Sequence, residues 1–249
     1  MTELFEGKTY IVTGASSGIG RAVCIELSRQ RANVVLVGRN EERLNDTLSK
    51  MEAGSHQLMS FDLSDIQKIN GISEEAYKKY EAIDGIVYCA GFTGHTTLKG
   101  STYEALHPYM LIHYYAFVEL IRCVVNSKKK KHPMRIVGMS SVGSILVIDN
   151  LTAYSAAKAA MDAAVRVLAV ELIKKNVTIN SIRPANVDTE MLNDLHDIYG
   201  DFGEQIKKTV QPLGLIDPVD VAKMALYLLS DAAKSITGMA VPINGGVRF

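Results

Sequence analysis

The chain has 249 residues, 47% of them hydrophobic, and its 27 lysines and arginines balance 27 aspartates and glutamates. This length suffices for one α/β core, so we expect a single domain over residues 1–249. The balanced charge argues against a nucleic-acid partner and favours a small molecule as the ligand. The first residues do not resemble a signal peptide and no apolar run is long enough to span a membrane, so we expect a soluble, cytoplasmic protein.

Short apolar runs alternate with segments of helical periodicity along the chain. The runs predict seven strands of the buried parallel type, at residues 8–13, 33–38, 56–61, 83–88, 134–139, 177–182 and 239–244. Apolar spacings of three and four predict helices at residues 18–30, 40–52, 103–125, 153–175 and 218–230. This order predicts an α/β fold with a Rossmann-type, doubly wound, parallel seven-stranded sheet and helices on both faces.

Two stretches interrupt this alternation. Residues 62–84 predict only a short or broken helix, which Gly71 would divide. Residues 184–218 are polar and punctuated by glycine, and we expect their centre, about residues 186–211, to cover a substrate. The three widely spaced cysteines suggest neither a disulfide framework nor a zinc site, so we expect buried free thiols and no metal.

The first predicted strand runs into a glycine-rich turn, TGASSGIG, which opens a helix. We expect Gly14 to permit a tight turn, Gly18 to let a pyrophosphate approach the backbone, and Gly20 to permit close helix packing. The residues of this turn expected to bind a dinucleotide are Gly14, Ser16, Ser17, Gly18, Ile19 and Gly20. The alternative is a Gly/Ser turn without a ligand, which the position after the first strand disfavours.

The second predicted strand ends in VVLVGRN, without the carboxylate that holds the adenine ribose in NAD-binding folds. Gly38 leaves space at this point, and Arg39 supplies a planar fork suited to a phosphate. These residues favour NADP(H) over NAD(H) as the cofactor. The alternative is a surface arginine that simply begins a helix.

The stretch TAYSAAKAA places a tyrosine and a lysine four positions apart. Positions i and i+4 share one face of a helix, so the Tyr154 hydroxyl and the Lys158 ammonium can reach the same small volume. The neighbouring alanines leave room for another group to approach.

Four motifs in one order resemble the classical short-chain dehydrogenase/reductase family, over nearly the whole chain. They are TGASSGIG, DGIVYCAG, YSAAK and INGG. The resemblance implies that Tyr154 protonates a carbonyl oxygen, and that Lys158 holds the nicotinamide ribose hydroxyls. Because a tyrosine has a reference pKa of about 10, we expect a cationic Lys158 to stabilise its phenolate.

The resemblance also implies a serine about thirteen residues before the tyrosine, which selects Ser141 among the three serines of MSSVGS. Its hydroxyl would orient the carbonyl oxygen and stabilise developing negative charge. We interpret Ser140 and Ser144 as turn residues. The further cofactor contacts implied by the family are Asp62 near the adenine, Ala90 and Gly91 near its ribose, and Thr189 at the nicotinamide amide, together with Leu63 and Val187.

The chain departs from the family pattern at a helix position that usually carries an asparagine and here carries His113. A histidine can conduct protons with a changed pH dependence, it can mark lost or changed chemistry, or it can simply pack between tyrosines. Tyr88 and Cys89 stand in place of paired asparagines and can alter the support of the central sheet. Ala185 follows Pro184 in place of a glycine, and alanine disfavours positive φ.

We predict an NADP(H)-dependent carbonyl reductase or alcohol dehydrogenase, with a 3-oxoacyl thioester on a carrier protein as the leading substrate. A sugar-derived, steroid or other small ketone is the alternative, as is an NADP(H)-binding sensor or scaffold without turnover. The run KKKKH (residues 128–132) with Lys174 and Lys175 fits solvated helix ends or a docking face for an acyl carrier protein. Family members are mostly homotetramers or homodimers, so we expect a homo-oligomer.

Overall fold

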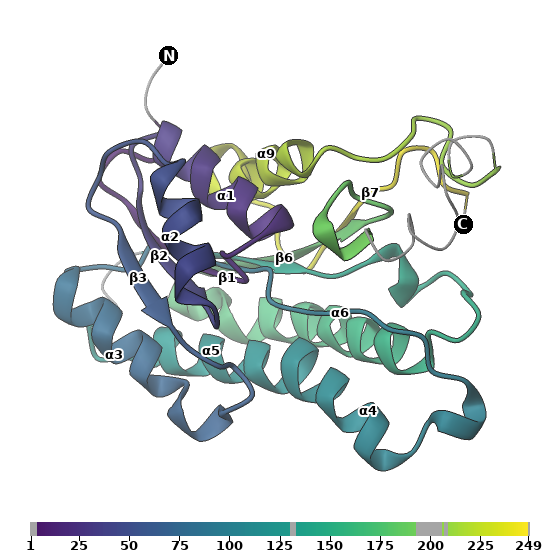
Figure 1. Ribbon diagram of the computed structural model, residues 1–249. Coiled ribbons are helices and arrows are strands. Elements are labelled where there is room, and N and C mark those ends of the chain that lie inside the picture. The colour runs from purple at the N-terminus through teal and green to yellow at the C-terminus, as the bar shows by residue number, and fades with distance from the viewer. Residues whose placement is uncertain (1–3, 130–132, 193–205, 207–208, 249) are drawn as a thin grey trace.

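Seven strands form the centre of the computed structural model, which describes residues 4–129, 133–192, 206 and 209–248. The strands are β1 (Thr9–Thr13), β2 (Asn33–Gly38), β3 (Gln57–Ser60), β4 (Gly85–Tyr88), β5 (Met134–Met139), β6 (Val177–Pro184) and β7 (Ala240–Ile243). They pair in parallel in the order β3-β2-β1-β4-β5-β6-β7, visible in Figure 1. The order reverses between β1 and β4, which is the switch point of a doubly wound sheet and confirms the predicted fold class.

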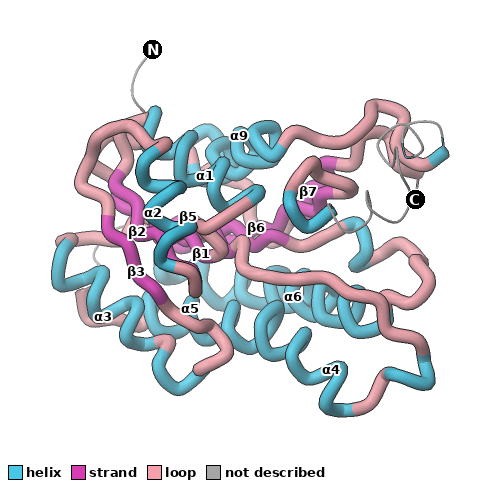
Figure 2. The backbone as a smooth tube through the Cα atoms, viewed as in Figure 1, coloured by secondary structure: helices cyan, strands magenta, loops and turns pink. Residues whose placement is uncertain are grey.

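Helices cover both faces of this sheet (Figures 1 and 2). One face carries α1 (Gly18–Arg29), α2 (Glu41–Ser49) and α9 (Pro218–Leu229). The other carries α3 (Asn70–Lys79), α4 (Tyr103–Met110), α5 (Ala116–Val125) and α6 (Thr152–Leu172). The described chain also contains 3-10 turns at Ile66–Lys68, Leu98–Gly100, Val142–Ser144, Ile173–Lys175, Glu190–Leu192 and Asp231–Ala233.

The strands are apolar on both sides because each side faces a layer of helices. All five residues of β1 and all four of β4 are buried. Successive side chains of β1 therefore enter different cores, Ile11 beneath α3 and α5, and Val12 beneath α1 and α9. The carboxyl ends of the central strands are left at one edge of the sheet, which is where such folds bind ligands.

Two details differ from the predicted elements. Gly71 does not divide the third helical stretch, because it lies in the first turn of α3 and the break falls earlier, after the turn Ile66–Lys68. The expected helix over residues 103–125 contains a π-helical segment, Leu111–Tyr115, between α4 and α5. Such segments occur often at functional sites, and this one carries His113.

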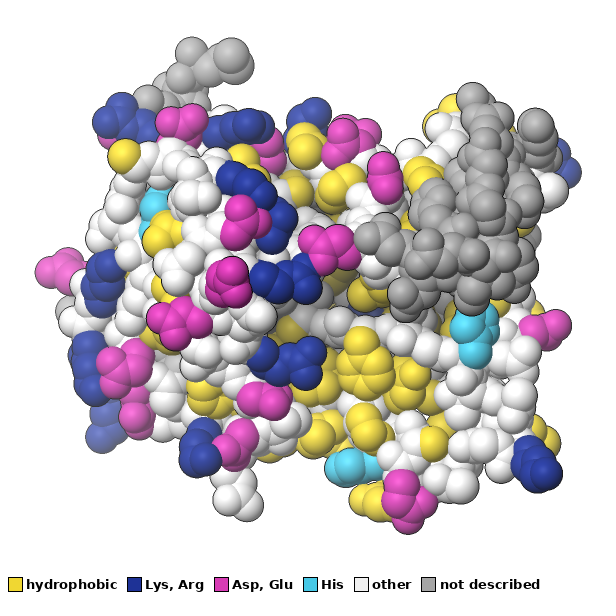
Figure 3. Space-filling view, viewed as in Figure 1, with side chains coloured by type: hydrophobic (Ala, Val, Ile, Leu, Met, Phe, Trp, Pro, Cys, Tyr) yellow, Lys and Arg dark blue, Asp and Glu magenta, His cyan; other side chains and the backbone are white. Residues whose placement is uncertain are grey.

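Part of two predicted regions lies outside the described residues. The expected substrate-covering segment is described from 186 to 192, at 206 and from 209 to 211, and the lysine run only at Lys128 and Lys129. Among the helices of the described chain, none is long and apolar enough to cross a membrane. On the face drawn in Figure 3, basic and acidic side chains are interspersed, as the balanced composition predicts.

Candidate active site

The glycine-rich turn lies at the carboxyl end of β1. Gly14 has a φ of +65°, a left-handed conformation that favours glycine, and a Cβ there would lie 2.8 Å from the backbone nitrogen of Ala90. A Cβ on Gly20 would lie 2.7 Å from the carbonyl carbon of Gly14. These glycines let the chain turn sharply beside β4 and let α1 begin directly against the turn.

Arg21 braces this turn against α2. Its Nη2 donates to the carbonyl oxygen of Ser16 at 2.7 Å, and its Nε donates to the Thr47 hydroxyl at 3.1 Å. The same hydroxyl donates to the carbonyl oxygen of Ala15 at 2.9 Å, and Asp46 lies 3.0 Å from the guanidinium. The turn is therefore held in one conformation by side chains of two helices.

A pocket of about 460 Å³ lies at the carboxyl end of β2. Its lining includes Ser16 and Arg39, which are predicted site residues, together with Asn40 and Arg43. The one signal for Arg43 in the sequence is its position one helical turn after Arg39. Two guanidinium groups around an open pocket provide the donors that bind a phosphate.

Asp62 follows β3 at the surface near this pocket. Its Oδ1 accepts a hydrogen bond from the Ser64 backbone N–H at 2.9 Å. That hydrogen bond lowers the pKa of Asp62, and the Arg39 charge contributes a smaller lowering. The carboxylate is therefore ionised near neutral pH and is available at this end of the site.

Ser141 and Tyr154 lie at the other end, after β5 and in the first turn of α6. The Ser141 hydroxyl accepts a hydrogen bond from the Gly143 N–H at 3.1 Å and begins the 3-10 turn Val142–Ser144. A Cβ on Gly143 would lie 3.6 Å from Cε1 of Tyr154, so this turn packs on the tyrosine ring. Burial raises the pKa of Tyr154, and its hydrogen bond with Ser141 opposes that rise. The hydroxyl is thus protonated at neutral pH, the form that a general acid requires.

Lys158 lies one turn further along α6 and is buried. Its Nζ donates to the carbonyl oxygen of Met139 at 2.6 Å, and lies 5.6 Å from the centre of the Tyr154 ring. Burial lowers the pKa of Lys158 to about 8, while Cys89 and Asp162 oppose this. Lysine and tyrosine share one face of α6 as predicted, but burial outweighs the expected lowering of the tyrosine pKa, since that pKa is raised.

Asp162 continues the same face of α6 and was not anticipated as part of the site. It is 2% exposed, and its carboxylate accepts hydrogen bonds from the Ser181 hydroxyl at 2.6 Å and from Nε of Arg183 at 2.8 Å. Both donors come from β6. Asp162 therefore joins α6 to the sheet directly behind Lys158.

His113 is fully buried and lies edge-on to the Tyr154 ring, with 5.5 Å between the ring centres. Its Nε2 is 2.9 Å from the carbonyl oxygen of Phe92, and because a carbonyl only accepts, Nε2 carries the hydrogen. Its Nδ1 is buried without a hydrogen-bond partner in the described chain. Burial, with a further contribution from Lys158, lowers the pKa of His113 to about 2. The ring is therefore neutral, and its free nitrogen is an acceptor.

The residues after β4 are shaped around this histidine. A Cβ on Gly91 would lie 2.9 Å from Nδ1 of His113 and closer still to Cε1. Gly91 is exposed on its other side, so it both admits the imidazole and leaves open the space predicted for the adenine ribose. The Tyr88 hydroxyl donates to the carbonyl oxygen of Ile112 at 2.6 Å, within the π-helical segment. Two departures from the family pattern, Tyr88 and His113, thus meet in one segment.

The remaining predicted residues also follow the carboxyl ends of strands. Thr189 packs on the glycine-rich turn, since its Cγ2 would be 3.1 Å from a Cβ on Gly18. Val187 is buried and forms a β-bridge with Ile216. The side chain of Leu63 is buried in the core beneath α3 and α5, so only its backbone is available for the predicted cofactor contact. Ser17 occupies the N-cap position of α1 without a capping hydrogen bond from its side chain. Ile19 packs on the core around α1, and Ala90 donates its N–H to the Thr13 hydroxyl at 3.2 Å.

Ala185 does not take a positive φ, so the strain expected of alanine at this position does not arise. The thiols of Cys24 and Cys123 are buried and that of Cys89 is half-buried, and all three are free. The expected free thiols are thus present, and one of them, Cys89, lies in the neighbourhood of Lys158.

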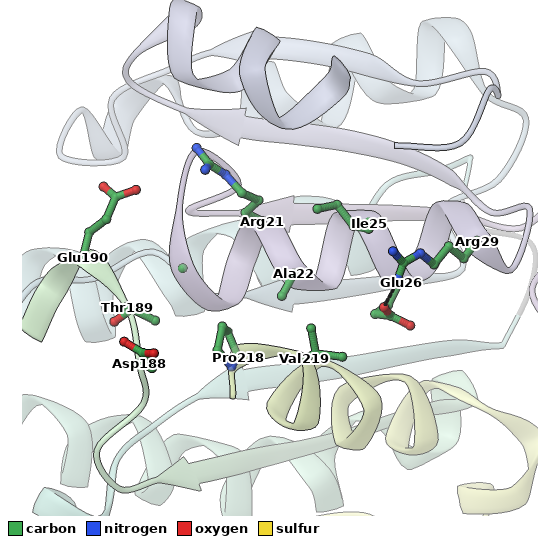
Figure 4. A pocket seen from close by; sticks show the side chains of 11 residues that line it. Arg21, Ala22, Ile25, Glu26, Arg29, Asp188, Thr189, Glu190, Pro218 and Val219 are labelled. Atoms are coloured by element: carbon green, nitrogen blue, oxygen red, sulfur yellow. Dashed lines mark hydrogen bonds and ion pairs between the residues drawn. The ribbon is translucent and has the colours of Figure 1, made fainter. Parts of the chain in front are cut away.

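A groove of about 440 Å³ runs along the surface where α1 meets α9 and the segment after β6 (Figure 4). Asp188, Thr189 and Glu190 line its end next to the start of α1, where Arg21 also lies. The segment after β6 therefore borders both the groove and the glycine-rich turn.

The carboxyl edge of the sheet carries the groups that a dinucleotide requires. A braced glycine-rich turn follows β1, arginines follow β2, and serine, tyrosine and lysine hydrogen-bonding groups lie beyond β5. The fold and these groups define an oxidoreductase that uses a nicotinamide cofactor.

Comparison with known proteins gives the family. Residues 14–248 match the family model described as enoyl-(acyl carrier protein) reductase. A 3-oxoacyl-[acyl-carrier-protein] reductase of Chlamydia trachomatis is 30% identical over 99% of this chain and 100% of its own length. A 3beta-hydroxysteroid dehydrogenase of Mediterraneibacter gnavus is 31% identical over 97% and 95%. The crystal structure of a dehydrogenase/reductase from Sinorhizobium meliloti superimposes with a TM-score of 0.90 at 27% identity, covering 98% of this chain and 96% of that one. The chain belongs to the short-chain dehydrogenase/reductase family.

Proposed function

We propose that this protein is an NADP(H)-dependent reductase of a carbonyl group on a largely apolar substrate, most simply a 3-oxoacyl thioester. The observation that carries the proposal is the contact of Ser141 with a protonated Tyr154 next to a buried Lys158. Arg39, in the pocket at the carboxyl end of β2, supports NADP(H) as the cofactor. The cofactor, when bound, supplies or accepts the hydride. The side chains of this protein bind the substrate, orient its carbonyl group and protonate the carbonyl oxygen.

Tyr154 is the proton donor in the reductive direction. Its raised pKa keeps the hydrogen on the oxygen until a carbonyl oxygen begins to take negative charge. Ser141 donates a hydrogen bond to the same oxygen and so stabilises that charge. Lys158, with a pKa of about 8, is mostly cationic at neutral pH and stabilises the phenolate left behind.

His113 acts as a neutral acceptor beside this group rather than as a titrating proton carrier. Its pKa of about 2 keeps it uncharged over the whole physiological range. The Phe92 carbonyl fixes its tautomer, and Nδ1 is left to accept one hydrogen bond. The imidazole of His113 also has a packing role, because it lies among the rings of Phe92, Tyr109 and Tyr154.

Apolar side chains around the Ser141 end favour an apolar substrate over a sugar. Ile145, Val147 and Ile148 follow the Ser141 turn and are 49%, 97% and 43% exposed. The N–H of Thr96 donates to the carbonyl oxygen of Asn150 at 2.6 Å, which brings the strongly exposed Leu98 into the same region. Exposed apolar groups at a site serve to bind apolar ligands. A steroid ketone is the second candidate, since one relative is named a 3beta-hydroxysteroid dehydrogenase.

An acyl carrier protein as partner follows from the thioester substrate. Two of the four described lysines of the proposed docking face are engaged within the chain, because Lys129 donates to the carbonyl oxygen of Tyr77 at 2.9 Å and Lys175 donates to the side chain of Asn126. These bonds favour the interpretation as helix ends. A homo-oligomer is also proposed, since Val167, Val170 and Ile173 are exposed along and just after α6.

The test measures oxidation of NADPH and of NADH with an acetoacetyl thioester, a steroid ketone and a sugar ketone. We expect turnover with the thioester, a preference for NADPH, and loss of turnover in Tyr154→Phe. Tyr227→Phe, on the surface of α9, is the matched control and should keep full activity. Tight NADPH binding without turnover on any ketone would refute the reductase and favour the sensor.

A further inference from the structure

The pocket at the end of β2 contains a second arginine that is paired with a carboxylate from a distant part of the chain. The guanidinium of Arg43 forms an ion pair with Glu190, which lies 147 residues later in the turn after β6. Arg43 and Glu190 are 43% and 51% exposed. The pair therefore joins α2, which lines the pocket, to the segment that borders the glycine-rich turn.

We propose that Arg43 is a second ligand for the 2′-phosphate that distinguishes NADP(H) from NAD(H), and that Glu190 is the carboxylate which this phosphate displaces. The proposal rests on the NADP(H) dependence proposed above. Glu190 is then a specificity-determining residue, although it never touches the phosphate.

The geometry of Arg43 supports the first part. Arg39 and Arg43 line the same pocket, one from the end of β2 and the other from the first half of α2. The Asn40 side chain accepts a hydrogen bond from the Arg43 N–H at 2.9 Å, which fixes the backbone from which the guanidinium reaches into the pocket. Two guanidinium groups can donate hydrogen bonds to several phosphate oxygens at once, whereas Arg39 alone provides a single guanidinium group.

The chemistry of the pair supports the second part. An ion pair this exposed is weak, because water screens it and two long side chains must be held in place. A phosphate monoester carries nearly two negative charges and three acceptor oxygens, so it is the stronger ligand for the same guanidinium. Two further acids act on these arginines, Asp46 on Arg43 and Asp62 on Arg39, and their repulsion of a phosphate increases the need for a second cation.

NAD(H) has a hydroxyl in place of this phosphate, so it leaves the Arg43–Glu190 pair intact. NADP(H) must open the pair, and opening it releases the turn Glu190–Leu192 from α2. Thr189, the neighbour of Glu190, packs on the glycine-rich turn (Figure 4). The binding of the 2′-phosphate is therefore linked, through the Arg43–Glu190 ion pair, to the segment after β6 that packs on the glycine-rich turn.

The test is isothermal titration of the full chain with NADPH and NADH, using Arg43→Gln, Glu190→Gln and the double variant. Arg43→Gln should weaken NADPH binding about tenfold or more, and Glu190→Gln should tighten it about two- to fivefold. Neither should change NADH binding. In the Arg43→Gln background, Glu190→Gln should have no further effect, because its influence acts through Arg43.

Glu75→Gln, which removes a similarly exposed glutamate paired with Lys78 on α3, is the matched control and should change neither affinity. An unchanged NADPH affinity in Arg43→Gln, together with loss of the preference in Arg39→Gln, would overturn this proposal and leave the NADP(H) dependence standing. A wild-type chain that binds NADH as tightly as NADPH would overturn both. A tightening by Glu190→Gln that persists without Arg43 would show general repulsion and refute the displacement.

Discussion

Gly91→Ala is expected to destabilise the protein through one identifiable contact. The new Cβ would lie 2.9 Å from Nδ1 of His113 and closer to Cε1, inside the 3.0 Å that real Cβ contacts essentially never breach. The imidazole has little freedom to move, because Phe92 fixes its Nε2 and the Tyr109 and Tyr154 rings pack around it. Such overpacking costs about 1–3 kcal/mol.

A smaller effect of opposite sign must be subtracted from this cost. Gly91 does not have a positive φ, so alanine fits its backbone and should stabilise by about 0.4–1 kcal/mol through the unfolded chain. The net loss is then on the order of 1–2 kcal/mol, which corresponds to a fall in Tm of about 2–8 °C. In the His113→Ala background the clash is gone, so Gly91→Ala should be neutral or stabilising.

The assay is urea unfolding followed by circular dichroism for the two single variants and the double variant. Gly71→Ala is the control, because a Cβ at this helical position meets nothing within 4 Å among the described residues and should stabilise by about 0.5–1 kcal/mol. If Gly91→Ala is as costly without the imidazole as with it, the contact with His113 is not the cause and the reasoning is refuted.

Three further predictions concern the same region. His113 has a folded pKa of about 2 and an unfolded pKa of about 6.5, so the unfolded chain binds more protons and stability falls as the pH drops below 6.5. Between pH 7 and pH 5 the free energy of unfolding of the wild-type chain should fall by about 2 kcal/mol more than that of His113→Asn, as measured by urea unfolding. Equal falls in the two proteins would contradict a buried neutral imidazole. Lys158 has a pKa of about 8 in the folded chain and 10.5 in the unfolded chain, so between these pH values the unfolded chain binds more protons and stability rises with pH. Lys158→Met should remove that rise. Tyr88→Phe leaves the Ile112 carbonyl without its donor and should cost about 1–3 kcal/mol, whereas a loss below about 0.5 kcal/mol would mean that the bond contributes little.

The strands could be predicted closely because their signal is local. The run at residues 33–38 matches β2, and that at residues 134–139 matches β5, since apolar side chains in sequence are what a doubly covered sheet requires. The pairing of Tyr154 with Lys158 follows equally from helical spacing. The π-helical segment could not be predicted, because the apolar periodicity of residues 103–125 continues through it without a break.

Features that depend on contacts between distant residues were beyond the sequence. The Arg43–Glu190 pair joins positions 147 residues apart, and nothing local to either residue indicates it. The protonation state of His113 likewise follows from burial and from the Phe92 carbonyl, neither of which a reference pKa contains.

The brace that Arg21 makes has a consequence for the thermodynamics of cofactor association. Its bonds to the Ser16 carbonyl and the Thr47 hydroxyl, and the bond from Thr47 to the Ala15 carbonyl, hold the glycine-rich turn through groups of the chain itself. The chain has therefore already lost the conformational entropy that ordering this turn would otherwise demand at the moment of binding. The cofactor therefore binds more tightly than it would to a disordered turn, and ordering of the turn does not limit the association rate.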